Sequence, residues 1–274
     1  MIEATFYLES QSNSKEALEI SLKKLLDEIK SFNNVKITRE LFHEIIGDED
    51  EMGRIFYSSV LEIDIKSPFR EYITFCMRLV PSTIEIISGD IKINPKDLLE
   101  IFGDVSSTVN KLCKKYNLTL YRVGGDDEGI KQGEIGIEQE DIEEAIDQGG
   151  ALFKFVVEAR AKDEKAAMEK TKELVNDTGA LINKMLAKKV GEGEAWEGVV
   201  GMEALFFDIE ALFEAVIKFS PVAMSIIEPE IIHLNMAELQ NIGIDIAGII
   251  QQLTFDVITR GMNAGQGSFR ATQA

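Results

Sequence analysis

Four consecutive acidic residues, Asp48, Glu49, Asp50 and Glu51, lie between two segments that alternate apolar and polar residues. Carboxylate oxygens are the ligands that Ca²⁺ and Mg²⁺ prefer, so this run is a weak candidate for a metal site. It lacks the ligand spacing and the central glycine of an EF-hand loop. Because runs of like charge usually lie in solvent, we favour an exposed hairpin tip that holds no metal.

A second candidate is a pair of glutamates, Glu9 and Glu158, each of which ends a segment with strand-like alternation. If two copies of one fold face each other, these side chains form an inter-repeat carboxylate pair near the axis between the copies. Two exposed glutamates that were duplicated with their strand are the simpler interpretation, because glutamate is rarely buried.

The other residues with chemical potential do not form a recognisable motif. Two histidines and two cysteines are spread through the chain without the spacing of zinc ligands. His43 shares the apolar parity of its predicted strand and is expected in the core, whereas His233 is expected in solvent. Cys76 and Cys113 have apolar neighbours in helical segments and are expected to be buried, reduced thiols.

The sequence also lacks a phosphate-binding glycine motif and a recognisable nucleophile motif. We therefore assign no catalytic residue, and we expect no cofactor and no bound metal.

The charge of the chain bears on its partners. With 48 acidic and 29 basic residues the net charge is −19, which repels phosphate backbones and anionic lipid surfaces. We therefore expect no nucleic-acid or membrane partner. A protein partner or self-association is expected, and a small-molecule ligand is possible.

The elements that must position these residues occur twice. Residues 5–9 align with residues 154–158 at an offset of 149, and residues 91–98 align with residues 232–239 at an offset of 141. The difference of eight residues falls in a hairpin region, where a change of length costs little. This placement of the gap supports a duplication.

Each half predicts a strand, a helix, a two-stranded hairpin, a second helix, a fourth strand and a third helix. Several predicted helix starts carry a side chain that can accept hydrogen bonds from the first turn. These residues are Ser14, Ser67 (followed by Pro68), Asn94, Asp163, Asp208 and Asn235. The first six elements have the order of a ferredoxin-like βαββαβ unit. The sequence thus predicts an α+β protein made of a tandem duplication of this unit, with a C-terminal helix in each repeat and a pseudo-twofold relation between them.

In this topology the fourth strand lies at a sheet edge. Pro229 in the second half and a change of alternation near Ser88 and Gly89 in the first half agree with an edge, because proline and bulges are tolerated there. The third helices and the partner repeat are expected to cover the otherwise open sheet faces. The isoleucine-rich third helix of the second half is expected at the interface between repeats or in a homodimer.

The predicted organisation is a first repeat (1–123), an acidic linker (124–149), a second repeat (150–260) and a flexible tail (261–274). Residues 124–150 hold ten acidic residues and one lysine, and residues 135–146 can form a short acidic helix. The chain opens directly with a strand pattern, and no segment is apolar enough to span a bilayer. We expect a cytoplasmic protein.

Two functions of different classes remain open. The first is a non-catalytic binding or assembly module that holds a protein partner through the inter-repeat surface or the acidic linker. The second is an enzyme or small-molecule sensor with a pocket between the two repeats, where ligands often bind. A polar-lined pocket at that place would favour the second function over the first.

Overall fold

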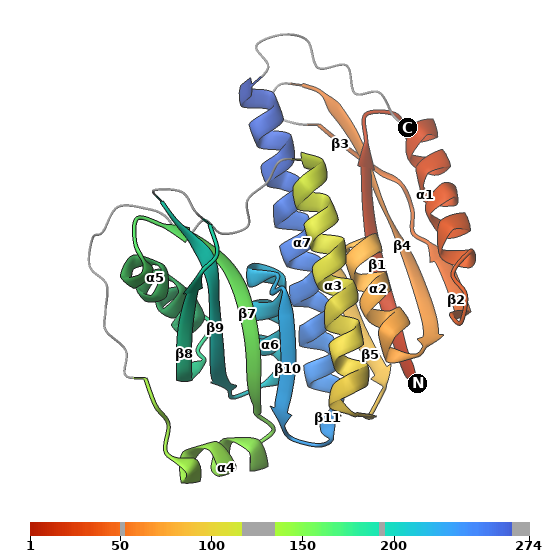
Figure 1. Ribbon diagram of the computed structural model, residues 1–274. Helices are drawn as coiled ribbons and strands as arrows, with labels where there is room; N and C mark the ends of the chain where they lie inside the picture. The colour runs from red at the N-terminus through yellow and green to blue at the C-terminus, as the bar shows by residue number, and fades with distance from the viewer. Residues whose placement is uncertain (50–52, 117–134, 192–194, 265–274) are drawn as a thin grey trace. The chain divides into compact units, whose positions relative to one another are not determined.

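The structure is a computed structural model that describes residues 1–49, 53–116, 135–191 and 195–264. It has the predicted mixed α+β class, and its two large sheets are antiparallel (Figure 1). The chain forms two compact units. Unit 1 contains Met1–Ile91 and Leu234–Ala274, and unit 2 contains Lys92–His233.

Unit 1 is built around a sheet with strand order β2-β4-β1-β5, in which the short strand β3 also pairs with β4. Its helices α1, α2 and α7 contact strands or helices of the same unit. The elements are β1 (Ile2–Ser12), α1 (Lys15–Lys30), β2 (Lys36–Phe42), β3 (Ile46–Glu49), β4 (Ile55–Ser67), α2 (Phe69–Leu79), β5 (Thr83–Ser88) and α7 (Met236–Ala264).

Unit 2 is built around a sheet with strand order β10-β7-β9-β8. Its elements are α3 (Pro95–Tyr116), α4 (Gln139–Asp147), β7 (Ala151–Ala161), α5 (Glu164–Asn176), β8 (Leu181–Lys189), β9 (Trp196–Phe206), α6 (Ile209–Phe219) and β10 (Ala223–Glu228). Two short strands, β6 (Ile91–Ile93) and β11 (Ile232–Leu234), pair with each other at the points where the chain passes from one unit to the other.

Most helices begin where the sequence predicts. An oxygen of Ser14, Asn94, Asp163, Asp208 or Asn235 accepts a hydrogen bond from a backbone amide two or three residues ahead. These bonds satisfy amides that the first helical turn leaves without a partner. The prediction for α2 is wrong by one residue. Ser67 still pairs with Ile2 as the last residue of β4, so Pro68 holds the cap position.

Aromatic side chains fill the face of each sheet that the helices cover. In unit 1, Phe6 of β1 meets Tyr72 and Phe75 of α2 in edge-to-face contacts. In unit 2, Phe102 of α3 meets Phe153 of β7 and Phe213 of α6 in the same geometry. All these rings are almost fully buried, so they anchor the helices to the sheets.

The third helices are exchanged between the units. Helix α3 of the first half belongs to unit 2, and helix α7 of the second half belongs to unit 1. Helix α7 lies against α2 and β5 in unit 1, and α3 lies against α6 and β10 in unit 2. Gly243 allows the close approach of α7, because a Cβ at this residue would lie 2.1 Å from the hydroxyl of Tyr72 and 2.8 Å from Ile84. Ile84 pairs with the buried Phe6 and therefore lies on the face that α2 covers. The expectation that the third helices cover the opposite faces is wrong.

Strands β5 and β10 lie at sheet edges, and each pairs irregularly with its neighbour. In unit 1 the register shifts between Ile86 and Ser88, which confirms the irregularity predicted there. In unit 2 it shifts between Ile226 and Glu228. Pro229 follows β10 directly instead of lying inside it.

Within the predicted acidic linker, α4 confirms the short acidic helix. Residues 124–134 of that linker and residues 265–274 of the predicted tail lie outside the described residues. Among the helices that the structure describes, none is both long and apolar enough to cross a membrane.

Candidate functional site

Each sheet has a face opposite the aromatic core, which we call its open face. In unit 1, alternation along β1 and β4 places Thr5, Tyr7, Glu62 and Asp64 on this face, because Phe6, Leu61 and Ile63 point into the core. In unit 2, the same alternation along β7 places Lys154 and Val156 on the open face, because Phe153 and Phe155 are buried.

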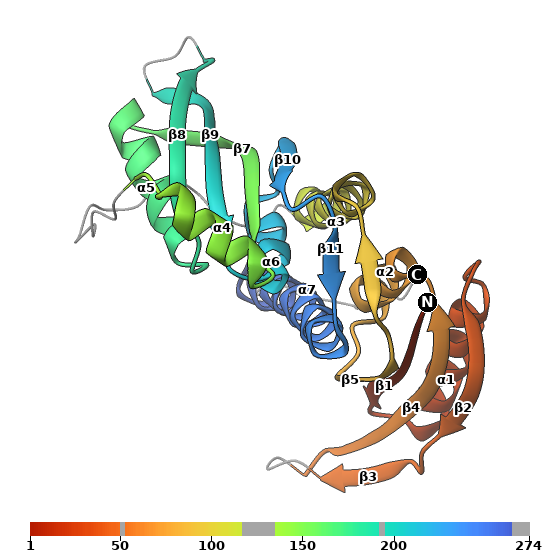
Figure 2. The same cartoon turned by 90° about the horizontal axis from the view of Figure 1, so that it is seen from below.

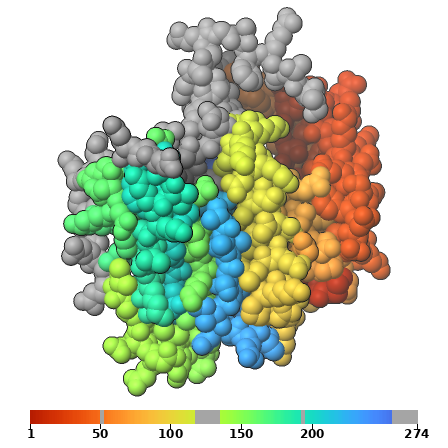
Figure 3. Space-filling model, in the orientation of Figure 1, coloured from red at the N-terminus to blue at the C-terminus, as the bar shows by residue number. Residues whose placement is uncertain are grey.

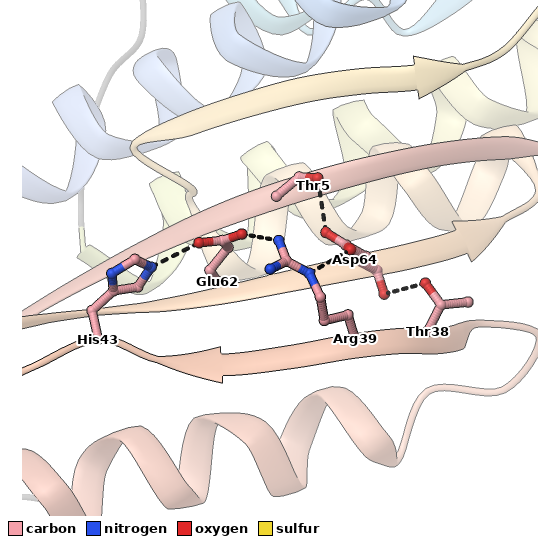
Figure 4. Close-up of polar contacts among 6 residues, drawn as sticks. All are labelled: Thr5, Thr38, Arg39, His43, Glu62 and Asp64. Carbon is pink, nitrogen blue, oxygen red and sulfur yellow. Dashed lines mark hydrogen bonds and ion pairs between the residues drawn. The ribbon is translucent and has the colours of Figure 1, made fainter.

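A network of ion pairs crosses the open face of unit 1 (Figure 4). Arg39 of β2 donates from Nε to Asp64 of β4 at 2.8 Å, and its Nη2 donates to the neighbouring Glu62. Thr5 of β1 donates to the other oxygen of Asp64 at 2.8 Å. The second oxygen of Glu62 lies 2.7 Å from Nε2 of His43. Each carboxylate oxygen in the network therefore has a partner from a neighbouring strand or from the residue that follows β2.

This network shifts the titration of its members. The Arg39 guanidinium holds the pKa of Asp64 below its usual value, and this effect outweighs the burial that opposes it. Burial raises the pKa of Tyr7, and the nearby carboxylates Glu85 and Glu62 add to the effect. The charges on this face are thus compensated by one another, which is the pattern of a structural ion-pair network.

The position of His43 differs from the prediction. It follows β2, its side chain is 44% exposed, and it pairs with Glu62 instead of lying in the core. The cause is a bulge in β2. Ile37 pairs with Ile65, and Arg39 pairs with Asp64, so residues of the same parity change faces between positions 37 and 39.

The open face of unit 2 carries one buried carboxylate, Glu203 of β9, which is 4% exposed. Asn183 donates to it at 2.6 Å, Lys184 at 2.9 Å, and Lys154 lies 3.2 Å away. Burial alone would raise the pKa of Glu203, but the hydrogen bonds from Lys184, Lys154 and Asn183 outweigh it and hold the pKa below its usual value. Glu203 is therefore a charged anchor for two lysines.

Beyond Glu203 the same face is a shallow apolar groove with a volume of about 600 Å³. Val156, Leu186, Val199 and Ala223 contribute apolar side chains, and Gly201 leaves the floor open between Val156 and Leu186. Leu186 is 75% exposed, which is unusual for a large apolar side chain. Lys154, Lys184 and Lys188 also line the groove. Figure 3 shows strands β7–β10 from this side.

One end of this open face is already occupied. Ile142 and Ala145 of α4 pack on Leu152 of β7 and Leu205 of β9 in a small apolar cluster. Figure 2 shows the helix α4 beside these strands. Leu152 precedes Lys154 and Val156 by two and four residues on β7, so all three lie on one face. Unit 2 therefore shows an acidic amphipathic helix bound to the sheet face that continues into the groove.

Those candidate residues from the sequence that the structure describes lie on different strands. Glu9 and Glu158 are exposed on β1 and β7 of different units, and their pairing stays a prediction. Asp48 and Glu49 are exposed in β3, whereas Asp50 and Glu51 lie outside the described residues. In the part of the chain that the structure describes, no three His, Cys, Asp or Glu residues cluster as metal ligands.

The remaining expectations concern the histidine and the thiols. His233 is exposed, as predicted. Both cysteines are buried and free, and the surroundings of Cys76 raise its pKa through burial, so its thiol is held in the neutral form.

Sequence reasoning misses the groove, although two signals for it exist. Lys184, Leu186 and Lys188 have the same parity on β8, so an apolar residue lies between two lysines on a surface-facing row. Gly201 is a second signal, because a glycine inside a strand often marks a close approach by another group.

Comparison with known proteins gives a family. The model of the MJ0538 family matches residues 3–260. The chain is 28% identical over 260 residues to "Uncharacterized protein MJ0538" of Methanocaldococcus jannaschii, and the match covers 92% of this chain and 96% of that protein. No solved structure matches the chain. The chain belongs to the MJ0538 family.

Proposed function

We propose that the protein is a non-catalytic binding module that holds a partner protein in the groove on the open face of unit 2. The observation that carries this proposal is an exposed apolar surface, which includes the 75% exposed Leu186, beside three lysines in a chain of net charge −19. An exposed apolar patch with a polar rim is typical of a protein interaction site.

The open face of unit 1 does not suit this role. Its corresponding surface is occupied by the side chains of Tyr7, Glu62 and Arg39, and the two carboxylates of β4 already have hydrogen-bond donors. A partner would have to displace these bonds, whereas the groove of unit 2 offers apolar contact without that cost.

We further propose that both units derive from one ferredoxin-like βαββαβ element and that the third helices were exchanged between the copies. In both sheets the strand order corresponds to the fourth, first, third and second strands of a half. The second strand of each half also carries a register shift at a matching place, between Ile37 and Arg39 and between Ile182 and Lys184. For the location we propose the cytoplasm, which suits two buried free thiols.

Site-specific photocrosslinking tests the binding function. A photoreactive phenylalanine analogue replaces Leu186 in the groove, and in a matched control it replaces Thr83, an exposed residue of β5 in unit 1. In extract of the source cells, we expect one protein adduct from position 186 and none from position 83. The adduct should disappear when Gly201→Leu fills the groove. Equal labelling from both positions, or no adduct from position 186, would contradict the proposal.

A further inference from the structure

Helix α4 shows what kind of segment the open face of unit 2 accepts. Ile142 is 3% exposed and Ala145 is 4% exposed, and both face the sheet. Its five acidic residues are all exposed: Glu140, Asp141, Glu143, Glu144 and Asp147. The helix is thus an acidic amphipathic helix that buries one narrow apolar stripe on strands β7 and β9.

The groove offers the same kind of surface further along the strands. Val156 and Gly201 are directly paired, as Leu152 and Leu205 are beneath α4. A Cβ at Gly201 would have no atom closer than 3.8 Å, so the floor has free space above it. Because glycine presents no side chain, a second helix can approach the sheet closely at this point.

The charges around the groove determine the sign of the charge that its ligand should carry. Three lysines (154, 184 and 188) and one glutamate (203) line it, which gives 3 − 1 = +2 in a chain of −19. Charges separated by more than about 8 Å are largely screened at physiological salt, so the local lysines dominate over the distant acidic surface. The position of α4 on the same face shows that five acidic residues are compatible with it.

We infer that the groove binds an acidic amphipathic helix of the partner protein. The apolar side chains of that helix pack on Val156, Leu186 and Val199, and its carboxylates face the lysines. This inference rests on the proposed binding function and specifies its ligand. The mode is that of a helix in an apolar groove, which is recognised through side chains three and four residues apart.

A peptide with the sequence of residues 137–148 provides the probe, because it contains the apolar stripe and the acidic residues of α4. We would acetylate, amidate and fluorescently label it, and measure its binding to the full-length protein by fluorescence anisotropy. We expect saturable binding that weakens as salt rises. A peptide with Ile142→Ser and Ile146→Ser should bind roughly tenfold more weakly or not at all, because it lacks the apolar stripe.

Variants of the protein locate the bound peptide. Gly201→Leu should weaken binding at least roughly tenfold, because the new side chain fills the groove floor. Thr83→Leu adds the same side chain to the open face of unit 1 and should leave binding unchanged. Lys188→Glu should weaken binding about fivefold, and high salt should reduce that difference. If the peptide binds Gly201→Leu as well as it binds the unaltered protein, the inference is overturned.

A second probe separates failure of this inference from failure of the binding function. The dye 8-anilinonaphthalene-1-sulfonate, which joins apolar rings to an anionic sulfonate, should bind the protein, and Gly201→Leu should abolish that binding. If the dye binds in the groove and the peptide does not, the helix inference fails and the groove remains a binding site. If neither probe binds and position 186 gives no crosslink, the binding function fails as well.

Discussion

The two open faces have the same strand order and differ in the side chains that they present to solvent. In unit 1, a row across the sheet joins Arg39, Asp64 and Thr5, and in unit 2 the matching row joins Lys184, Glu203 and Lys154. Two residues further along, the rows diverge. Unit 1 has Leu41, Glu62 and Tyr7, and unit 2 has Leu186, Gly201 and Val156.

This difference shows how few residues separate an open face whose charges compensate one another from one that exposes an apolar groove. Glu62 recruits Arg39 and His43, and these side chains occupy the face. Gly201 recruits no side chain, and Val156 beside it needs no polar partner. An exposed apolar surface gains free energy when a partner removes it from water, whereas a compensated polar surface gains little.

The largest expected effect concerns the covered faces. Gly243→Ala places a methyl group against the Tyr72 hydroxyl and disturbs the 2.7 Å hydrogen bond from Tyr72 to the Leu239 carbonyl. We expect a loss of about 3 kcal/mol in unfolding free energy, measured by urea denaturation with circular dichroism. Gly248→Ala in the same helix is the control. A Cβ there has no neighbour within 4 Å, so we expect a gain of about 0.5–1 kcal/mol.

A smaller effect is expected where α4 covers one end of the open face of unit 2. Ile142→Ala truncates a buried side chain of α4 in the apolar cluster with Leu152 and Leu205, at a cost of about 2 kcal/mol. Because α4 can open locally, we expect hydrogen exchange of its amides to become roughly 30-fold faster. Amides of α5 should be unaffected, since α5 packs against the sheet independently of α4. Equal acceleration in both helices would show that the face and the core unfold together.

The charged rows should differ from the groove in their response to acid. The depressed pKa of Glu203 means that its ionised form stabilises the fold above pH 4.5, and that this contribution is lost as the pH falls through the folded pKa. Glu203→Gln should cost about 1 kcal/mol at pH 7, a small cost because solvent screens the exposed lysine ends, and less at pH 3, where the contribution of the carboxylate has fallen. Urea titrations at the two pH values measure this. Asp64→Asn should show the same sign on unit 1, with its loss below pH 3.8.

The smallest effect on stability is expected in the groove itself. Leu186→Thr alters a side chain that is 75% exposed, so the unfolding free energy should change by less than about 0.5 kcal/mol. The same variant should weaken the acidic peptide several-fold, measured by anisotropy. A large loss of stability would mean that Leu186 serves the fold, and the contrast between the two open faces would then lose its functional meaning.

The local elements of this fold are accessible to sequence reasoning. The caps at Ser14, Asn94, Asp163, Asp208 and Asn235 are readable because each depends on a few adjacent residues. The mixed α+β class follows from the order of the alternating and helical segments.

Features that depend on residues far apart are not accessible in this way. The bulge at position 38 reverses the parity of β2, and no sequence signal there predicts it. The sequence therefore predicts His43 in the core, whereas the residue lies beside Glu62. The fit of Gly243 under Tyr72 joins residues that are 171 positions apart. The groove requires Val156, Leu186 and Gly201 to be brought together by strand register, which the sequence does not state.

The late position of α7 in the chain has a consequence during synthesis. When the ribosome has made residues 1–91, the apolar surfaces of α2 and β5 are present, but the helix that shields them begins at Met236. About 140 further residues must be added first, which takes roughly 7–28 s at typical elongation rates. Throughout that interval the nascent chain exposes the apolar surface around Tyr72 and Ile84. Early protection of this surface by chaperones would favour a high yield of native protein.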